Sequence, residues 1–291
     1  MAANKRNAII MAAGTASRFV PLSAEIPKGL LEVKGEILIE RQIRQLREAG
    51  IDDITIVVGY KAEMFQYLVD KFGVSLVLNE DFNRYNNTSS VIRVIDKLGD
   101  TYICSSDNYF PANVFIGEPQ ESFYSALFAH GITKEYCLRI DDNDNITDVS
   151  IGGADSWYMI GHVYFSRSFS EIFKVILEKE YEKPETRQGY WEDVYIKYLN
   201  ALPAMKIHRY SDNDIYEFDS IDELREFDSS YITDTRSSIL KRITKLMGCS
   251  EADLSHFEKV AEVETGLKFS FERDGDKYLY CATNQSITKQ P

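Results

Sequence analysis

Short apolar runs alternate with amphipathic segments along residues 7–104 of this 291-residue chain. The runs have the length of strands that are buried on both faces of a parallel sheet, and the segments between them repeat apolar residues with a helical period. Strands are predicted over 7–11, 54–58, 74–78 and 101–104, and helices over 37–49, 62–71 and 89–98. Such alternation predicts a doubly wound, mostly parallel α/β sheet whose ligands bind at the carboxyl ends of the strands.

From residue 123 onward, shorter runs with alternating polarity replace this pattern. They predict a smaller β-rich part with strands over 123–129, 136–140, 146–151 and 158–165, and a turn at 141–145. Helices are expected over 169–181, 191–199 and 221–227, and edge strands over 205–210 and 215–218. We therefore expect one large domain over residues 1–230.

A polar stretch over 229–238 predicts a boundary, so residues 231–291 form a small C-terminal α+β appendage. Helices over 239–246 and 251–260, a hairpin of 267–271 and 278–281, and a frayed tail over 283–291 are expected there. The segment TGLKFSFERDGDKYLY resembles the opening hairpin of choline kinase-like N-lobes. Because no catalytic Asp loop follows it, we expect an appendage without kinase activity.

The formal charge of -13 argues against a nucleic-acid partner, which would require a basic surface. The four cysteines show no C-x-x-C spacing, so we expect reduced thiols in a cytoplasmic protein. No stretch approaches the ~20 apolar residues of a membrane helix, and no membrane insertion is expected. Any anionic substrate must be bound by local cations.

The run AIIMAAGTASRFVPLSAEIPK has the layout of a phosphate site. A buried strand ends in a loop of small residues whose backbone N–H groups can approach an anion, and the cations Arg18 and Lys28 follow from the same segment. An ordinary turn would explain the small residues alone. It does not explain the full order of Gly, Ser, Arg, Phe, Pro, Leu, Ser and Pro-Lys.

Asp107 follows the strand predicted over 101–104, on the same edge of the sheet as Gly14. A carboxylate at this place suits a magnesium ion that bridges the protein and a triphosphate, although a turn or N-cap Asp is the alternative. Because Mg²⁺ takes one or two carboxylates with phosphates and waters, a second acid is expected nearby. Glu192 is the first choice, and Asp193 is the alternative.

The phosphate loop resembles the signature of nucleotidyltransferases that join an NTP to a phosphorylated small molecule, A-A-G-x-G-S/T-R-x-x-P-L-S/T and then Pro-Lys. Ala16 replaces the second glycine, which is tolerable if its backbone φ is negative. The resemblance implies that Arg18 and Lys28 are catalytic, with Lys28 reaching the α-phosphate. It also implies that the triphosphate is held by Ala13, Gly14, Thr15, Ala16 and Ser17.

Within this superfamily, residues 7–228 resemble the bacterial CTP:phosphocholine cytidylyltransferases. The shared segments are Tyr-Asn-Asn-x-x-Ser at 85–90, Gly-Tyr at 59–60, Asp-Asn-Tyr at 107–109 and I-Y-E-x-D at 215–219. Asn86 and Asn87, with Ser89, can present both donors and acceptors to a pyrimidine edge. A helix N-cap would explain only one of these residues.

A quaternary ammonium acceptor requires aromatic faces and nearby carboxylates. The second half supplies Tyr136, Trp157, Tyr158, Tyr190, Trp191 and Tyr216 together with Glu192, Glu217 and Asp219. Aromatic residues at strand positions are more often core residues. Tyr136, Trp191 and Glu217 match positions of the family, so these three and Asp219 are the predicted acceptor-binding residues.

These patterns predict a magnesium-dependent enzyme that converts CTP and phosphocholine to CDP-choline and pyrophosphate. No general base is needed, because the acceptor phosphate is already ionised when it attacks the α-phosphorus in line. Another acceptor, namely phosphoethanolamine, 2-aminoethylphosphonate or a sugar-1-phosphate, is an alternative. A second alternative is a non-catalytic regulatory protein with this fold. The oligomeric state stays open, and a homodimer is one possibility.

Overall fold

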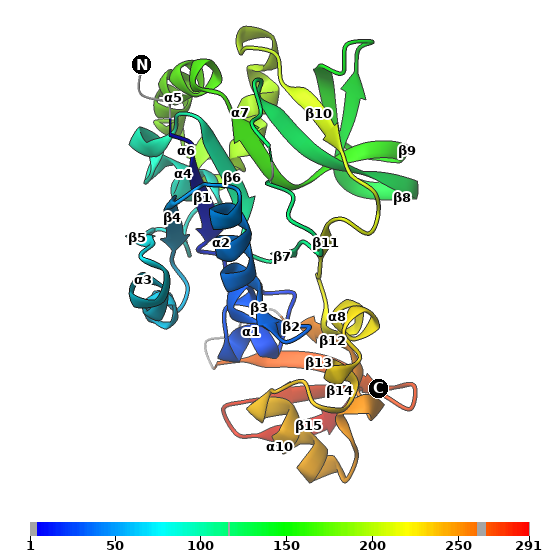
Figure 1. The fold of residues 1–291 in the computed structure, drawn as a ribbon. Helices are drawn as coiled ribbons and strands as arrows, with labels where there is room; N and C mark the ends of the chain where they lie inside the picture. The colour runs from blue at the N-terminus through cyan, green and yellow to red at the C-terminus, as the bar shows by residue number, and fades with distance from the viewer. Residues whose placement is uncertain (1–4, 116, 261–265, 291) are drawn as a thin grey trace. The chain divides into compact units, whose positions relative to one another are not determined.

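The computed structural model describes residues 5–115, 117–260 and 266–290 (Figure 1). The chain forms two compact units, of which the first contains residues 1–14 and 38–217 and the second contains 15–37 and 218–291. The chain therefore passes from one unit to the other after Gly14, after Ile37 and after Glu217. The division into domains of 1–230 and 231–291 stays a prediction.

A seven-stranded sheet forms the centre of the first unit, in the order β10-β8-β9-β6-β1-β4-β5. Its parallel neighbours in the N-terminal half are β1 (Asn7–Ala12), β4 (Asp53–Val58), β5 (Ser75–Leu78) and β6 (Thr101–Ser105). The other half adds β9 antiparallel to β6 and β8, and the edge strand β10 (Lys206–Arg209) parallel to β8. The mostly parallel α/β sheet is thus confirmed.

The β-rich part is one long antiparallel ribbon of β8 (Phe123–Ile140) and β9 (Ile146–Phe165), drawn in green in Figure 1. The turn at 141–145 is confirmed, since the N–H of Asp141 donates to the carbonyl of Asn145 at 3.0 Å. The prediction of four separate short strands is wrong, because each pair of predicted strands belongs to one long strand. Backbone pairing continues with irregular register through exposed residues, because ladder hydrogen bonds need no apolar side chains.

Short helices and a two-stranded ribbon complete the first unit. The helices are α2 (Leu38–Glu48), η2 (Ala62–Phe65), α3 (Tyr67–Phe72), α4 (Thr88–Ile92), η3 (Ile95–Lys97), α5 (Arg167–Tyr181), α6 (Pro184–Gln188), α7 (Trp191–Lys197) and η4 (Leu199–Ala201). The ribbon pairs β7 (Asn108–Tyr109) with β11 (Tyr216–Glu217). The helices predicted over 62–71 and 89–98 are each broken into an α-helical and a 3₁₀ piece. Helices this short depend on tertiary packing rather than propensity.

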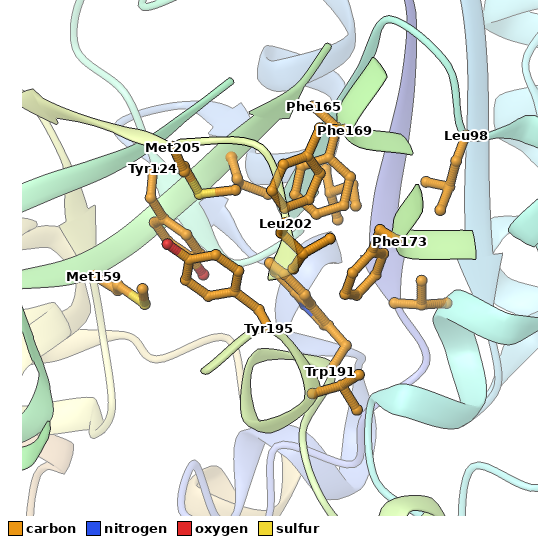
Figure 2. Packing of buried hydrophobic residues seen from close by; sticks show 14 of the residues in the cluster. Leu98, Tyr124, Met159, Phe165, Phe169, Phe173, Trp191, Tyr195, Leu202 and Met205 are labelled. Atoms are coloured by element: carbon orange, nitrogen blue, oxygen red, sulfur yellow. The ribbon is translucent and has the colours of Figure 1, made fainter. Parts of the chain in front are cut away.

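Aromatic side chains join α5 and α7 to the sheet (Figure 2). Phe165, Phe169, Phe173, Trp191 and Tyr195 are each at most 3% exposed. The ring centroids of Phe165 and Phe169 are 4.5 Å apart, and those of Phe165 and Trp191 are 5.5 Å apart. Burial of a large apolar side chain contributes about 1.5–3 kcal/mol, so this cluster fixes the position of α7 on the sheet.

The second unit combines short helices with a four-stranded antiparallel sheet in the order β12-β13-β14-β15. The strands are β12 (Ser255–Lys259), β13 (Lys268–Arg273), β14 (Asp276–Cys281) and β15 (Ser286–Lys289). The remaining elements are α1 (Leu22–Glu25), η1 (Lys28–Leu30), β2 (Glu32–Val33), β3 (Glu36–Ile37), α8 (Ile221–Phe227), α9 (Ser230–Thr233), α10 (Ser238–Met247) and η5 (Glu251–Asp253). The hairpin turned at Asp274-Gly275 is confirmed.

Two predictions for the C-terminal segment are wrong. Residues 251–260 do not form one helix, because η5 is followed by β12, which pairs with β13. The tail is not frayed over its whole length, because β15 pairs with β14. Both elements depend on hydrogen bonds to other segments, which a local pattern of apolar residues does not reveal. In the described part of the chain no helix is long and apolar enough to span a membrane.

Candidate active site

The carboxyl end of β1 is joined by hydrogen bonds to the ends of its two neighbours. The N–H of Ser106 donates to the carbonyl of Met11 at 3.1 Å, and the N–H of Tyr60 donates to the carbonyl of Ala13 at 3.0 Å. A Cβ at Gly59 would lie 2.9 Å from that carbonyl and 2.6 Å from the Cβ of Phe82, so only glycine fits there. The predicted phosphate loop therefore begins from a rigid edge, where Gly14 is exposed.

Backbone pairing places Glu217 opposite the residue that follows Asp107. Asp107, which is half-buried, directly precedes β7, where Asn108 pairs with Glu217 of β11. The Nδ2 of Asn108 also donates to the Oε2 of Glu217 at 3.3 Å. A predicted metal ligand and a predicted acceptor-binding residue thus lie on paired segments, which their separation in sequence does not indicate.

Glu192 of α7 is hydrogen-bonded to the asparagine loop and to β8. The Nδ2 of Asn87 and the hydroxyl of Tyr124 each donate to one carboxylate oxygen of Glu192, both at 3.2 Å. Burial raises the pKa of Glu192 to about 7, and the hydrogen bonds oppose this rise only in part. Glu192 is thus bonded to two donors of the protein, and its predicted role as a magnesium ligand stays a prediction.

The asparagine loop is held mainly by its own side chains. The Oδ1 of Asn87 accepts from the backbone N–H of Trp191 at 2.9 Å, which satisfies a donor in the first turn of α7. Ser89 is fully buried, and its hydroxyl donates to the carbonyl of Asn86 at 2.7 Å and accepts from Asn79. Asn87 and Ser89 therefore shape the loop, and their contact with a base stays a prediction, as does that of Asn86.

Tyr136 and Tyr190 form an aromatic pair backed by a carboxylate. The hydroxyl of Tyr136 donates to Asp193 Oδ1 at 3.0 Å, and the backbone N–H of Tyr190 donates to Oδ2 at 2.8 Å. The rings meet edge to face with centroids 6.5 Å apart, and Tyr190 is 46% exposed. Burial and the bond to Asp193 raise the pKa of Tyr136, so its hydroxyl stays protonated. Asp193, the alternative metal ligand, is thus committed to this pair.

Trp191 is a core residue, contrary to its predicted place in the acceptor site. Its ring stacks on Tyr124 at 12° with centroids 6.0 Å apart, and Phe165 and Phe173 contact it edge to face (Figure 2). Only 3% of the residue is exposed. A ring enclosed in this way presents no face to a ligand in this structure, so the core role expected of most aromatic residues applies here.

In the second unit, Asp219 lies between the two predicted catalytic cations. The Nη1 of Arg18 is 2.8 Å from Asp219 Oδ2, and the Nζ of Lys28 is 4.0 Å from Oδ1. The side chain of Lys28 is only 9% exposed, and its Nζ lies 5.8 Å from the ring centroid of Phe19. Arg18, in contrast, is exposed. Asp219, predicted from the sequence to bind the acceptor, is paired with these cations in the structure.

Ala16 adopts a left-handed backbone conformation, with φ at 46°. The condition under which the sequence makes Ala16 tolerable, a negative φ, is therefore not met, and the family's glycine at this position has a conformational reason. The carbonyl of Ala16 accepts from the N–H of Phe19 at 2.9 Å, which closes the turn ahead of Arg18. Thr15 and Ser17 on either side are exposed.

Comparison with known proteins places the chain in a family. Residues 8–110 match the model of the MobA-like NTP transferase domain. A 2-aminoethylphosphonate cytidylyltransferase of Lancefieldella rimae is 35% identical over 81% of this chain and 97% of its own length. A choline-phosphate cytidylyltransferase of Streptococcus pneumoniae is 32% identical over 76% of this chain and 96% of its own length. The chain belongs to this bacterial cytidylyltransferase family.

Solved structures agree with this assignment. The CTP:phosphocholine cytidylyltransferase of Streptococcus pneumoniae superposes with a TM-score of 0.75 at 32% identity, over 78% of this chain and 99% of the other. The inositol-1-phosphate CTP transferase of T. maritima shares the fold. It superposes with a TM-score of 0.60 at 16% identity, over 78% of this chain and 94% of the other. The cytidylyltransferase described here thus has the Rossmann-like nucleotidyltransferase fold, and about a fifth of its chain lies outside each match.

The replacement Ala16→Gly should stabilise the protein by about 1 kcal/mol, because glycine adopts a positive φ without the steric cost of a Cβ. The free energy of unfolding in urea, measured beside wild type at one pH, checks this. A destabilised variant would contradict the left-handed conformation at this position.

The stability of the protein should depend on the protonation of Glu192. Its pKa is about 7 in the folded protein and near 4.5 in the unfolded chain, so the folded state binds more protons between these values. The contribution of Glu192 to the free energy of unfolding is then fully present below pH 4.5. It falls as pH rises to 7, by at most about 3 kcal/mol. Urea unfolding of wild type and Glu192→Gln at pH 5, 6, 7 and 8 measures the difference. Parallel pH profiles would show that Glu192 titrates normally.

Proposed function

We propose that this cytidylyltransferase transfers CMP from CTP to phosphocholine and releases CDP-choline and pyrophosphate. The pneumococcal relative, a choline-phosphate cytidylyltransferase, supports this acceptor. The relative from Lancefieldella rimae, a 2-aminoethylphosphonate cytidylyltransferase, makes that phosphonate the second candidate. The two acceptors differ at the nitrogen, which is quaternary in one and a primary ammonium in the other.

The observation that favours phosphocholine is the pair of Tyr136 and Tyr190 with Asp193 behind it. A primary ammonium must find hydrogen-bond acceptors for its three protons, whereas a quaternary ammonium has none to donate and prefers aromatic faces. Both oxygens of Asp193 already accept hydrogen bonds from the protein, at 3.0 and 2.8 Å. The carboxylate therefore supplies charge close to an exposed ring, and the protein already uses one acceptor site of each of its oxygens.

Arg18 and Lys28 supply the positive charge that the transfer requires. In the proposed reaction an oxygen of the acceptor phosphate forms a bond to the α-phosphorus, and the bond from that phosphorus to the bridging oxygen of pyrophosphate breaks. The electron pair leaves with pyrophosphate, so negative charge on it increases. Two cations stabilise this charge, and both lie within 4.0 Å of their shared partner Asp219 in the free protein.

We also propose magnesium as the cofactor, with Asp107 and Glu217 as its protein ligands in place of the pair of Asp107 and Glu192. The described residues contain no group of three or more His, Cys, Asp or Glu side chains suited to a metal. One or two carboxylates suffice for Mg²⁺, because phosphates and waters complete its shell. Backbone pairing brings the segments of Asp107 and Glu217 together, which supports this pair. When bound, the ion neutralises charge on the triphosphate.

An assay of pyrophosphate release tests the proposal with four NTPs and a panel of acceptors. We expect turnover with CTP and phosphocholine, with kcat/KM at least about tenfold above that for 2-aminoethylphosphonate, because a tenfold ratio needs only about 1.4 kcal/mol. Asp107→Ala serves as the inactive control. Preference for the phosphonate or for a sugar-1-phosphate would overturn the proposed acceptor and leave cytidylyl transfer intact.

Loss of the Tyr136 ring should weaken acceptor binding selectively. Tyr136→Ala removes an aromatic face worth up to about 2 kcal/mol to a desolvated cation, so the KM for phosphocholine should rise by about 10- to 30-fold with that for CTP little changed. Tyr136→Phe keeps the ring and loses only the bond to Asp193, and is the matched control. Equal increases in both KM values would remove Tyr136 from the acceptor site.

A further inference from the structure

A cavity of about 810 Å³ in the second unit joins the predicted catalytic loop to the C-terminal sheet. Its lining comes from Ser17 and Arg18, from Asp219 and Ser220 ahead of α8, and from residues 257–259 of β12. β12 is an edge strand of the sheet, and Figure 1 shows it beside α8. The sheet thus provides one wall of a cavity that contains Arg18.

Hydrogen bonds join α8 to β12 and to the segment that precedes β12. The guanidinium of Arg225 in α8 donates to the carbonyls of Leu254 and Glu251, at 2.5 and 2.8 Å. Asp222 of the same helix accepts from the backbone N–H of His256 at 2.7 Å. Charge-assisted bonds of this kind are short and directional. They hold β12 in a defined position relative to α8.

The backbone of β12 is distorted at the cavity. The register with β13 shifts between Ser255 and Glu258, and His256 within this interval has φ at 51°. Bulges in edge strands change the direction of the following side chains and are frequent beside active sites. A non-glycine residue at positive φ persists only where its surroundings hold it, as Asp222 does here. The distortion immediately precedes Lys259.

The acidic residues of the cavity are already paired with cations. Asp219 is bound by Arg18, and Glu258 is bound by Lys277 with N and O atoms 2.6 Å apart. These pairs reduce the repulsion that two carboxylates would exert on an incoming anion. Arg18 and Lys259 balance the two acids of the lining, and Lys28 and Lys277, which lie within 4.0 Å of those acids, add positive charge. In a chain of formal charge -13, this local excess of cations suits a polyanion.

We propose that Lys259 is a polyphosphate-binding residue, which contacts the β- and γ-phosphates of CTP, and then pyrophosphate, across the cavity from Arg18. The hydroxyls of Ser17 and Ser220 on the same lining can donate to phosphate oxygens. This inference rests on the proposed use of CTP but not on the identity of the acceptor. It gives the C-terminal sheet a direct part in substrate binding.

Titration calorimetry with pyrophosphate and Mg²⁺ tests this role in the intact chain. Lys259→Ala should raise the Kd of pyrophosphate by about tenfold, as expected for loss of one charge-assisted hydrogen bond, and Lys259→Arg should restore most of the affinity. Lys289→Ala is the matched control, because Lys289 lies on β15 at the opposite edge of the same sheet. In kinetics, Lys259→Ala should raise the KM for CTP and leave that for the acceptor unchanged.

Wild-type affinity in Lys259→Ala would overturn the inference, as would a wild-type protein that binds neither pyrophosphate nor CTP. Lys259→Gln, which keeps most of the side chain, replaces the alanine variant if that one does not fold. An equal loss in Lys289→Ala would also overturn it, because the effect would then be general surface charge. A preference for an acceptor other than phosphocholine would overturn the proposed acceptor, while the pyrophosphate measurements stand on their own.

Discussion

The pairing of β1 with β4 and β6 is the constraint on which the site in the first unit depends. β1 pairs with β4 from Asn7 to Ala12 and with β6 from Asn7 to Met11. Its residues Ile9 and Ile10 are fully buried. Parallel pairing brings the carboxyl ends of three strands to one edge. The loops that leave them carry Gly14 and Asp107, so two residues distant in sequence serve one end of the sheet.

A second feature is that the carboxylates at the start of α7 accept hydrogen bonds from other groups of the protein. Glu192 accepts from Asn87 and Tyr124, and Asp193 accepts from Tyr136 and from backbone. A buried carboxylate without such partners would be costly, and its pKa would rise further. The network therefore stabilises α7 against β8 and keeps the carboxylate of Asp193 beside Tyr136 and Tyr190.

The C-terminal sheet and the loop with the predicted catalytic cations belong to the same compact unit. Ser237 and Ser238 donate to the carboxylate of Glu25 in α1, and the hydroxyl of Tyr231 donates to the carbonyl of Glu32 at 2.7 Å. These bonds span about two hundred residues of sequence. The terminal segment therefore contacts residues on both sides of Lys28, and a change in it can reach the predicted catalytic loop through direct contacts.

The sequence by itself determined the alternation of strands and helices in the first half, the loop of small residues and the candidates Arg18, Lys28 and Asp107. These follow from local patterns of polarity and from motifs of adjacent residues. Only the tertiary structure decided that Trp191 is enclosed in the core and that Asp219 pairs with cations. It also decided that residues 255–259 form a strand. Each of these outcomes depends on a partner far along the chain, and packing and pairing energies between distant segments outweigh local propensity.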